Sequence, residues 1–161
     1  MYKKEAKIIS EIFKSEIKGI HHIGSTSVVN LISKPIIDIM VVVKDIERID
    51  SFNSAMMDIG YEPKGESGIP KRRFFQKGEN NRTHHVHFYE KGEPEIKRHL
   101  SFRNYLRAHP DVAEKYGSFK KELAKHFPDD IEAYIKGKEQ LVKEIEEKAV
   151  DWDKKVDIDE E

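Results

Sequence analysis

The chain has 161 residues, no cysteine and a formal net charge of -1, and charged and apolar residues each make up 37% of it. This length predicts one domain over residues 1–161 with a core of its own. The lack of thiols excludes disulfide scaffolds, thiolate zinc sites and cysteine nucleophiles, and the near-neutral charge gives no support for bulk binding to nucleic acid or membranes. The apolar run 36–43 is too short to span a bilayer, and the acid-containing start does not fit a signal peptide, so we expect a cytoplasmic protein.

Apolar spacing and turn residues predict the elements of the first half of the chain. Gly19 and Gly60 end two segments of helical periodicity, and the β-branched run before Lys44 is typical of an interior strand. The expected elements are a helix at 2–17, a strand at 20–23, a turn at 24–27, a helical turn at 28–32, a strand at 36–43 and a helix at 46–59.

The second half begins with two β-like runs, 72–77 and 83–89, which the sequence GENN joins into an antiparallel pair. From Pro94 to about Val150 the spacing is helical, with breaks at HPD (109–111) and HFPDD (126–130). The acidic tail from about residue 151 to residue 161 is expected to fray. The predicted fold class is therefore α+β, a small mixed sheet with flanking helices and a helical C-terminal third.

Small residues fill the turn at 24–27, whose sequence is GSTS. Such a turn lets the backbone approach a phosphate closely, and the amides that open the next helical turn favour an anion. The turn is neither a Walker loop, since the GxxxxGK[ST] spacing and its lysine are missing, nor a dinucleotide fingerprint. The alternative is a turn without a ligand, which is the commoner case for Ser- and Gly-rich segments.

Asp38 interrupts the apolar strand at 36–43. An unpaired carboxylate is costly inside a buried strand, so Asp38 must either pair or lie at the mouth of a site. Phosphoryl and nucleotidyl transfer use carboxylates to hold a divalent metal beside the phosphates, which suits an acid placed after a Gly-Ser turn. The alternative is a structural ion pair with a buried arginine or a cap on a backbone edge.

Strand alternation in THHVHFYE places His85, His87 and Tyr89 on one face and Val86 and Phe88 toward the core. Two imidazoles at this spacing chelate a metal or carry protons, although strand histidines are often structural. We predict that both rings converge with Asp38 on one side of the sheet, near the turn at 24–27.

His99, Arg103 and Arg107 lie four residues apart on the helix expected after Pro94. Such a stripe binds phosphate or a carboxylate, and the alternative is a solvated charged face. We predict that Arg103 points into the pocket and that Arg107 stays nearer solvent. Lys120, Lys121 and Lys138 are expected to be solvated.

Several motifs in order resemble the GrpB family, small bacterial proteins related to polymerase-β-type nucleotidyltransferases, from about residue 21 to residue 149. The matching stretches are HIGSTSV, KPIIDIMV, GIPKRRFF, THHVHF, HLSFRNYLRAHPDVAEKY, FKKELA and AYIKGKEQL. The resemblance implies a nucleotidyltransferase-type sheet, and family members fused to dephospho-coenzyme A kinase imply a link to nucleotide or coenzyme metabolism.

The resemblance also implies site residues. Gly24 and Ser25 match the Gly-Ser pair that contacts the triphosphate, and Asp38 matches the second of two superfamily acids, the first falling on Ile36. The third acid matches the strand of His85 and His87. The family's Pro-Gly after GSTSV is Val29-Asn30 here.

These residues predict a site for a nucleotide or another phosphorylated small molecule with a divalent metal, magnesium, manganese or zinc. The reaction would be nucleotidyl or phosphoryl transfer to a small acceptor, and the alternative is a non-catalytic nucleotide-binding, anion-binding or partner domain. The predicted catalytic residues are Asp38, His85 and His87, the metal ligands are Asp38 and His87, and the phosphate-binding residues are Gly24, Ser25, Ser27, Lys34 and Arg103.

Overall fold

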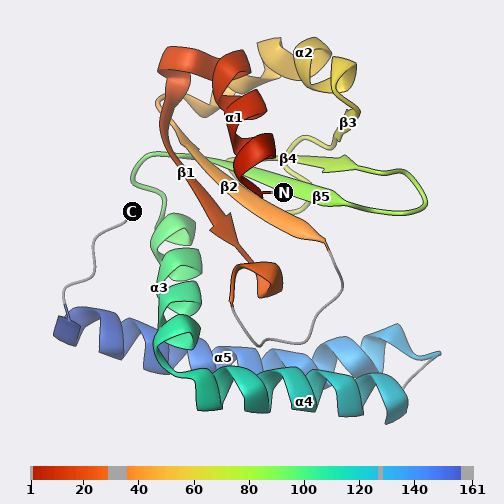
Figure 1. Ribbon diagram of the computed structural model, residues 1–161, viewed down its shortest axis with the longest axis vertical. Helices are drawn as coiled ribbons and strands as arrows, with labels where there is room; N and C mark the ends of the chain where they lie inside the picture. The colour runs from red at the N-terminus through yellow and green to blue at the C-terminus, as the bar shows by residue number, and fades with distance from the viewer. Residues whose placement is uncertain (1, 29–35, 127–128, 157–161) are drawn as a thin grey trace.

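A computed structural model describes residues 2–28, 36–126 and 129–156 (Figure 1). The helices are α1 (Tyr2–Phe13), α2 (Asn53–Asp58), α3 (Pro94–Ala108), α4 (Pro110–His126) and α5 (Ile131–Val156). The strands are β1 (Ile17–Ile23), β2 (Ile37–Val43), β3 (Tyr61–Pro63), β4 (Arg72–Lys77) and β5 (His84–Glu90). Three 3-10 helices are η1 (Lys14–Glu16), η2 (Ser25–Ser27) and η3 (Ile46–Phe52).

The five strands form one mixed sheet in the order β1-β2-β5-β4-β3. β2 and β5 are parallel, and every other neighbouring pair is antiparallel. The parallel register sets Asp38 opposite His85 and Met40 opposite His87. Residues opposite one another in a sheet point to the same face, so this register brings the acid and both histidines to one side.

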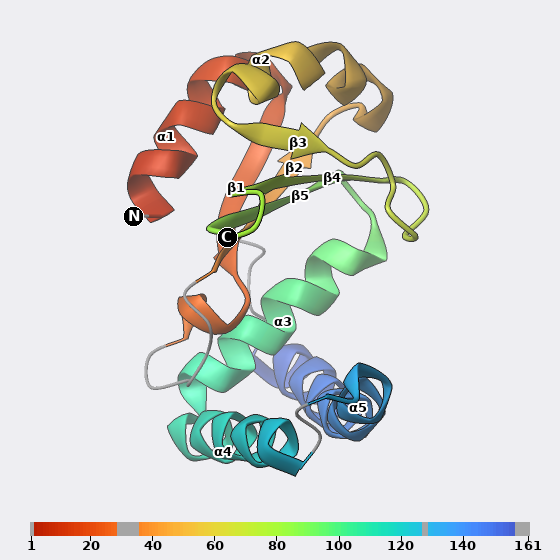
Figure 2. The same ribbon diagram turned by 90° about the vertical axis from the view of Figure 1, so that its right-hand side faces the viewer.

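Both faces of the sheet are covered, by α1, η3 and α2 on one side and by α3 on the other (Figures 1 and 2). Ile39, Val41 and Phe88 pack fully buried under the first layer. Met40 and Tyr89 pack against α3 on the second face, which also carries Asp38 and the two histidines. α4 and α5 lie beyond α3, away from the sheet (Figure 2). The second face of the sheet therefore packs against α3, and Asp38 lies on this face at the N-terminal end of β2.

The predicted sheet and fold class are confirmed, and the first half differs in its details. The N-terminal helix ends at Phe13 because Lys14 has a φ of 49°, and pairing with Val43 begins β1 at Ile17. Residues 46–52 form a 3-10 helix where an α-helix was expected, capped by Asp45, whose carboxylate accepts from the Glu47 amide. β3 is too short to show a periodicity in sequence. The helical turn expected at 28–32 falls almost wholly outside the described residues.

The predicted helical C-terminal third is confirmed, with breaks at His109 and after His126. The prediction of a frayed tail is wrong for residues 151–156, because α5 continues to Val156. Asp153 is 5% exposed and accepts a hydrogen bond from the Ser101 hydroxyl at 2.7 Å, which ties α5 to α3. Among the described residues, no helix has both the length and the apolar character needed to cross a bilayer.

Ser101→Ala is expected to lower the free energy of unfolding by about 1–3 kcal/mol, because it removes a donor from a buried carboxylate. The measurement is urea denaturation of both proteins. Ser51→Ala is the control, since Ser51 donates to the Arg48 carbonyl in an exposed position and its loss should cost less than about 0.5 kcal/mol. Equal midpoints for the two variants would contradict a structural role for the Ser101–Asp153 contact.

Candidate functional site

Asp38 and two histidines meet on the α3-facing side of the sheet. Oδ1 of Asp38 lies 3.4 Å from Nδ1 of His85 and 3.3 Å from Nε2 of His87. The rings come from alternate positions of β5, and the carboxylate comes from the parallel neighbour β2. The predicted convergence is therefore present in the structure, while the catalytic and metal-binding roles of these residues stay predictions.

The GSTS turn lies directly against this carboxylate. Gly24 has a φ of +73°, and a Cβ placed on it would come within 2.6 Å of Oδ2 of Asp38. The hydroxyl of Ser27 donates to the Gly24 carbonyl at 2.5 Å, and the Ser27 amide donates to the same oxygen at 3.1 Å. The hydroxyl proton of Ser27 is thus used inside the turn, which leaves its oxygen rather than its proton for a ligand. Lys34 and the side chain of Ser25, both predicted to bind phosphate, lie outside what the structure describes.

Asp38 is ionised in the folded protein. Burial raises the pKa of its carboxyl, but hydrogen bonds from His85 and His87, and the attraction of the two rings when they are protonated, outweigh burial and lower the pKa to about 2. The partner of this buried acid is therefore a pair of imidazoles. An arginine was the partner expected if no metal were bound, and Arg103 contacts other oxygens instead.

Arg103 and Arg107 occupy the positions predicted for them. Arg103 is 7% exposed and donates to the His22 carbonyl at 3.2 Å and to the amide oxygen of Asn104 at 3.0 Å. Arg107 is exposed, and its Nε donates to the Ser27 carbonyl at 2.8 Å. Arg103 thus faces the interior, and Arg107 binds the turn from the solvent side. The alternative of a solvated charged face is wrong for Arg103.

A cavity of about 250 Å³ lies between the GSTS turn and the helices α3, α4 and α5. Its lining includes Gly24 and the charged side chains Arg98, Arg103, Lys138 and Glu146. Arg98 and Glu146 form an ion pair at 2.8 Å, and the described lining holds three cations and one carboxylate. Lys138 was expected to be solvated, and the packing of α5 against α3 and α4 brings it to the cavity instead.

Burial lowers the pKa values of three basic groups in and near the cavity, and neighbouring cations lower them further. Burial lowers the pKa of Lys120, the charge of Lys138 lowers it further, and Asp38 raises it. Burial and the charge of Arg107 lower the pKa of Arg103 to about 10. Burial, Arg98 and His87 lower the pKa of His99 to about 4, so this ring is neutral at pH 7. Burial and neighbouring cations disfavour the charged forms of Lys120 and Arg103, and a bound anion would relieve that cost.

The predicted metal site requires side-chain donors that can bind the ion. Within the described parts of the chain, no three or more His, Cys, Asp or Glu side chains are arranged to hold a metal ion. Asp38, His85 and His87 contact one another through the atoms that would be ligands. As they stand, they form a hydrogen-bonded group, and a metal at Asp38 and His87 stays a prediction.

The family model described as GrpB protein matches residues 1–148. The chain belongs to the GrpB family. A crystal structure of conserved protein GrpB from Enterococcus faecalis superposes with a TM-score of 0.88 at 46% identity, covering 93% of this chain and 90% of that one. A structure of Cid1 in complex with its short product ApU gives a TM-score of 0.51 at 14% identity over 77% of this chain and 40% of that one, and this likeness concerns the fold alone.

Two curated relatives also resemble this GrpB chain. UPF0157 protein YqkA of Bacillus subtilis is 52% identical over 153 residues, which cover 95% of this chain and 45% of the relative. Glutamate-rich protein GrpB of Alkalihalophilus pseudofirmus is 35% identical over 150 residues, 90% of this chain and 86% of the relative. The chain thus spans less than half the length of the B. subtilis relative.

Sequence reasoning missed several residues of this GrpB site. Arg72 on β4 contacts His87, and Arg98 and Glu146 pair across the cavity from α3 and α5. Arg72 precedes the apolar pair FF, but nothing in that pattern distinguishes it from the neighbouring Arg73, which pairs with Asp50. Strand alternation relative to β5 was the available signal, because it places only one of these arginines on the histidine face.

Proposed function

We propose that this GrpB protein binds the phosphate groups of a nucleotide, or of another phosphorylated small molecule, in the cavity beside Gly24. The observation that carries the proposal is a partly open cavity whose described lining holds three cations, Arg98, Arg103 and Lys138, and one carboxylate, Glu146. Arginine and lysine are the usual partners of phosphate oxygens, and partial burial strengthens the attraction. Gly24 also lines the cavity, and because it has no side chain, a phosphate can approach its backbone closely.

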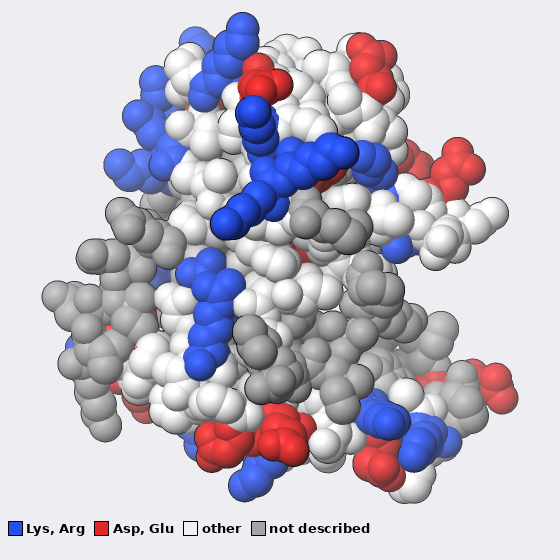
Figure 3. All heavy atoms as spheres, in the orientation of Figure 1, with Lys and Arg blue, Asp and Glu red and all other residues white. Residues whose placement is uncertain are grey.

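The outer surface supports the approach of an anion. Figure 3 shows Lys and Arg side chains gathered over α1, whose exposed residues include Lys3, Lys4 and Lys7. The start of α1 lies beside β1, because the Tyr2 ring stacks on His22 with centroids 4.7 Å apart. His22 is also the residue whose carbonyl accepts from Arg103. This positive surface covers the other face of the sheet and approaches the cavity only at the start of α1, where it adds to the field that attracts an anionic ligand.

Group transfer is the second candidate function, and the contact between Asp38 and His85 favours it. The carboxylate holds Nδ1 of His85, which places Nε2 on the opposite edge of the ring. In the proposed step Nε2 accepts the proton of an acceptor hydroxyl while the hydroxyl oxygen bonds to phosphorus. The bond from phosphorus to the bridging oxygen breaks, and the leaving group departs with the electron pair: pyrophosphate in nucleotidyl transfer, or the nucleoside diphosphate in phosphoryl transfer. The nucleotidyltransferase-type fold is compatible with this step.

Titration calorimetry with ATP, CTP, GTP and UTP tests the binding proposal. We expect at least one nucleotide to bind, and Arg103→Ala to weaken that binding by tenfold or more, roughly the value of one charge-assisted hydrogen bond. Arg48→Ala is the control, because Arg48 forms exposed ion pairs with Glu16 and Asp45 on the opposite face of the sheet. Circular dichroism checks that both variants are folded.

Two results would contradict the proposal: no heat from any of the four nucleotides, or equal affinities for Arg103→Ala and Arg48→Ala. The same mixtures, with magnesium, manganese or zinc and without, distinguish the two candidate functions. Release of pyrophosphate or of a nucleoside diphosphate identifies an enzyme, whereas binding without turnover identifies a nucleotide-binding module.

A further inference from the structure

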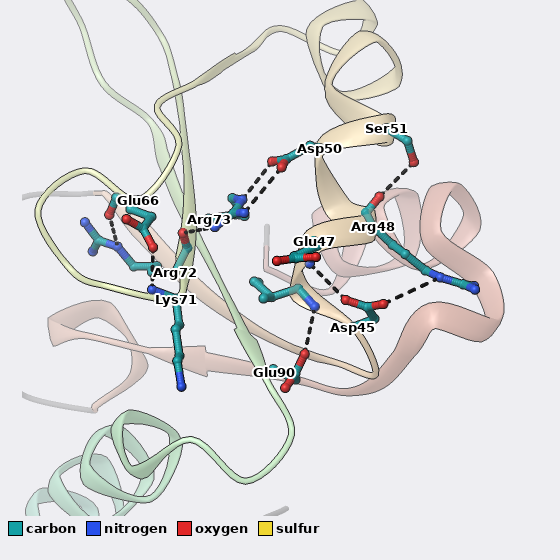
Figure 4. Close-up of polar contacts among 11 residues, drawn as sticks. Asp45, Glu47, Arg48, Asp50, Ser51, Glu66, Lys71, Arg72, Arg73 and Glu90 are labelled. Carbon is teal, nitrogen blue, oxygen red and sulfur yellow. Dashed lines mark hydrogen bonds and ion pairs between the residues drawn. The ribbon is translucent and has the colours of Figure 1, made fainter.

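Arg72 is a buried cation held in one position at the start of β4. Its side chain is 7% exposed, Nε donates to the Glu66 carbonyl at 3.1 Å, and Nη2 donates to the Ser67 carbonyl at 2.8 Å. Figure 4 shows the guanidinium turned back toward Glu66 in the preceding loop. The group also lies 4.8 Å from the centre of the Phe74 ring. These three contacts, two hydrogen bonds and one cation–π contact, fix where Nη1 points.

Nη1 of Arg72 lies 3.3 Å from Nδ1 of His87. A guanidinium has only donors, so Nδ1 of His87 must be the acceptor and cannot carry a proton. The proton of the neutral ring is then on Nε2, which donates to Oδ1 of Asp38 at 3.3 Å. Both nitrogens of His87 are therefore committed, one as an acceptor from arginine and the other as a donor to the carboxylate.

A metal ligand must present a lone pair, and a neutral imidazole has one unprotonated nitrogen to offer. In His87 that nitrogen faces a cation, while the nitrogen that faces Asp38 carries the proton. The orientation of a metal-binding histidine is normally fixed by an acceptor on its far nitrogen, so that the near nitrogen is bare. Arg72 is a donor at that position and imposes the opposite arrangement.

We propose that Arg72 keeps a divalent metal from binding directly between Asp38 and His87, by holding the ring proton of His87 on the nitrogen that faces the carboxylate. The site is then a hydrogen-bonded chain that runs from Arg72 through His87 to Asp38, with His85 on the same carboxylate oxygen. The inference concerns the group beside the cavity, and it holds whether or not a nucleotide binds there. Its test therefore uses the metal alone.

The test compares zinc and cobalt binding by the intact chain, Arg72→Met and Arg73→Met, using calorimetry and the absorption of bound cobalt. Methionine keeps an unbranched apolar stem in place of the arginine stem and removes every donor. Arg73 is the matched control, because it lies next in sequence and pairs instead with Asp50 at 2.7 Å (Figure 4). We expect Arg72→Met to gain about tenfold or more in metal affinity, the scale of a changed partner behind a metal ligand, and Arg73→Met to match the parent.

Nitrogen-15 spectra of the histidine rings at pH 8 provide a second readout that needs no variant. In the parent protein we expect His87 to carry its proton on Nε2 and to keep it there when zinc is added. A proton on Nδ1, or its loss from Nε2 with zinc, would overturn the proposal. A folded Arg72→Met protein with the metal affinity of Arg73→Met would overturn it equally. If Arg72→Met does not fold, the spectra of the parent protein still decide.

Discussion

Asp38→Asn is expected to lower the free energy of unfolding by about 2 kcal/mol at pH 7, without any added ligand. The carboxylate is the shared acceptor of His85 and His87, and the difference between its ordinary pKa of 3.8 and the folded value of about 2 corresponds to this energy. Asparagine keeps the volume and one acceptor oxygen but removes the charge. The imidazoles then lose a charge-assisted acceptor in a place that water reaches only in part.

The stabilisation by Asp38 is expected to decrease as the pH falls. The pKa of Asp38 is lower in the folded protein than in the unfolded chain, so its contribution is complete well above pH 3.8 and disappears as the pH falls toward about 2. Urea denaturation at pH 7, and again at the lowest pH at which both proteins fold, should show the gap between parent and variant narrowing. Asp50→Asn is the control, since its pair with Arg73 is exposed and is expected to change stability by less than about 1 kcal/mol.

The opposite outcome would identify a metal ligand. A carboxylate held among metal ligands carries an electrostatic cost in the free protein, so Asn would leave stability unchanged or raise it slightly. Metal-dependent nucleotide binding would then be lost while the fold survived. That combination for Asp38→Asn would contradict both the structural role of the carboxylate and the proposed effect of Arg72.

Gly24→Ala is expected to cost about 2–4 kcal/mol, of which the backbone accounts for only part. A φ of +73° disfavours any residue with a Cβ by about 1–2 kcal/mol. In addition, the new methyl group would lie 2.6 Å from Oδ2 and 3.0 Å from Cβ of Asp38. These atoms cannot move aside without breaking the contacts with His85 and His87. The substitution should therefore disturb the site as well as the turn.

Gly65→Ala separates the two causes. Gly65 has a φ of +60°, and a Cβ there would meet nothing within 4 Å, so this variant carries the backbone cost alone. Thermal denaturation should give Gly24→Ala the larger loss, and histidine ring spectra should change for Gly24→Ala while staying as in the parent for Gly65→Ala. Equal losses with unchanged spectra would mean that the turn does not press on Asp38.

Much of the fold follows from patterns within single segments. The β-branched run that ends at Val43 predicts β2, and alternation in THHVHFYE predicts which side chains of β5 share a face. These predictions succeed because a strand has a fixed period of two residues, whatever packs on it. The same reasoning fails at residues 14–17 and 46–52, where pairing with β2 and capping by Asp45 replace α-helical periodicity that the local sequence would also permit.

The site divides in the same way. By itself the sequence determined that His85 and His87 share one face of their strand, because strand periodicity is a local property. Their meeting with Asp38 beside Gly24 was predicted with the help of the family resemblance, and the parallel pairing of β2 with β5 produces it. Only the tertiary structure decided that Lys138 lines the cavity and that Asp153 is buried, because both depend on how α5 packs against α3. The tautomer of His87 also depends on the tertiary structure. Strand alternation places Arg72 on the histidine face, but the loop carbonyls of Glu66 and Ser67 hold its guanidinium against His87. Charge and protonation depend on which donors surround a group in space, and residues far apart in the chain supply those donors.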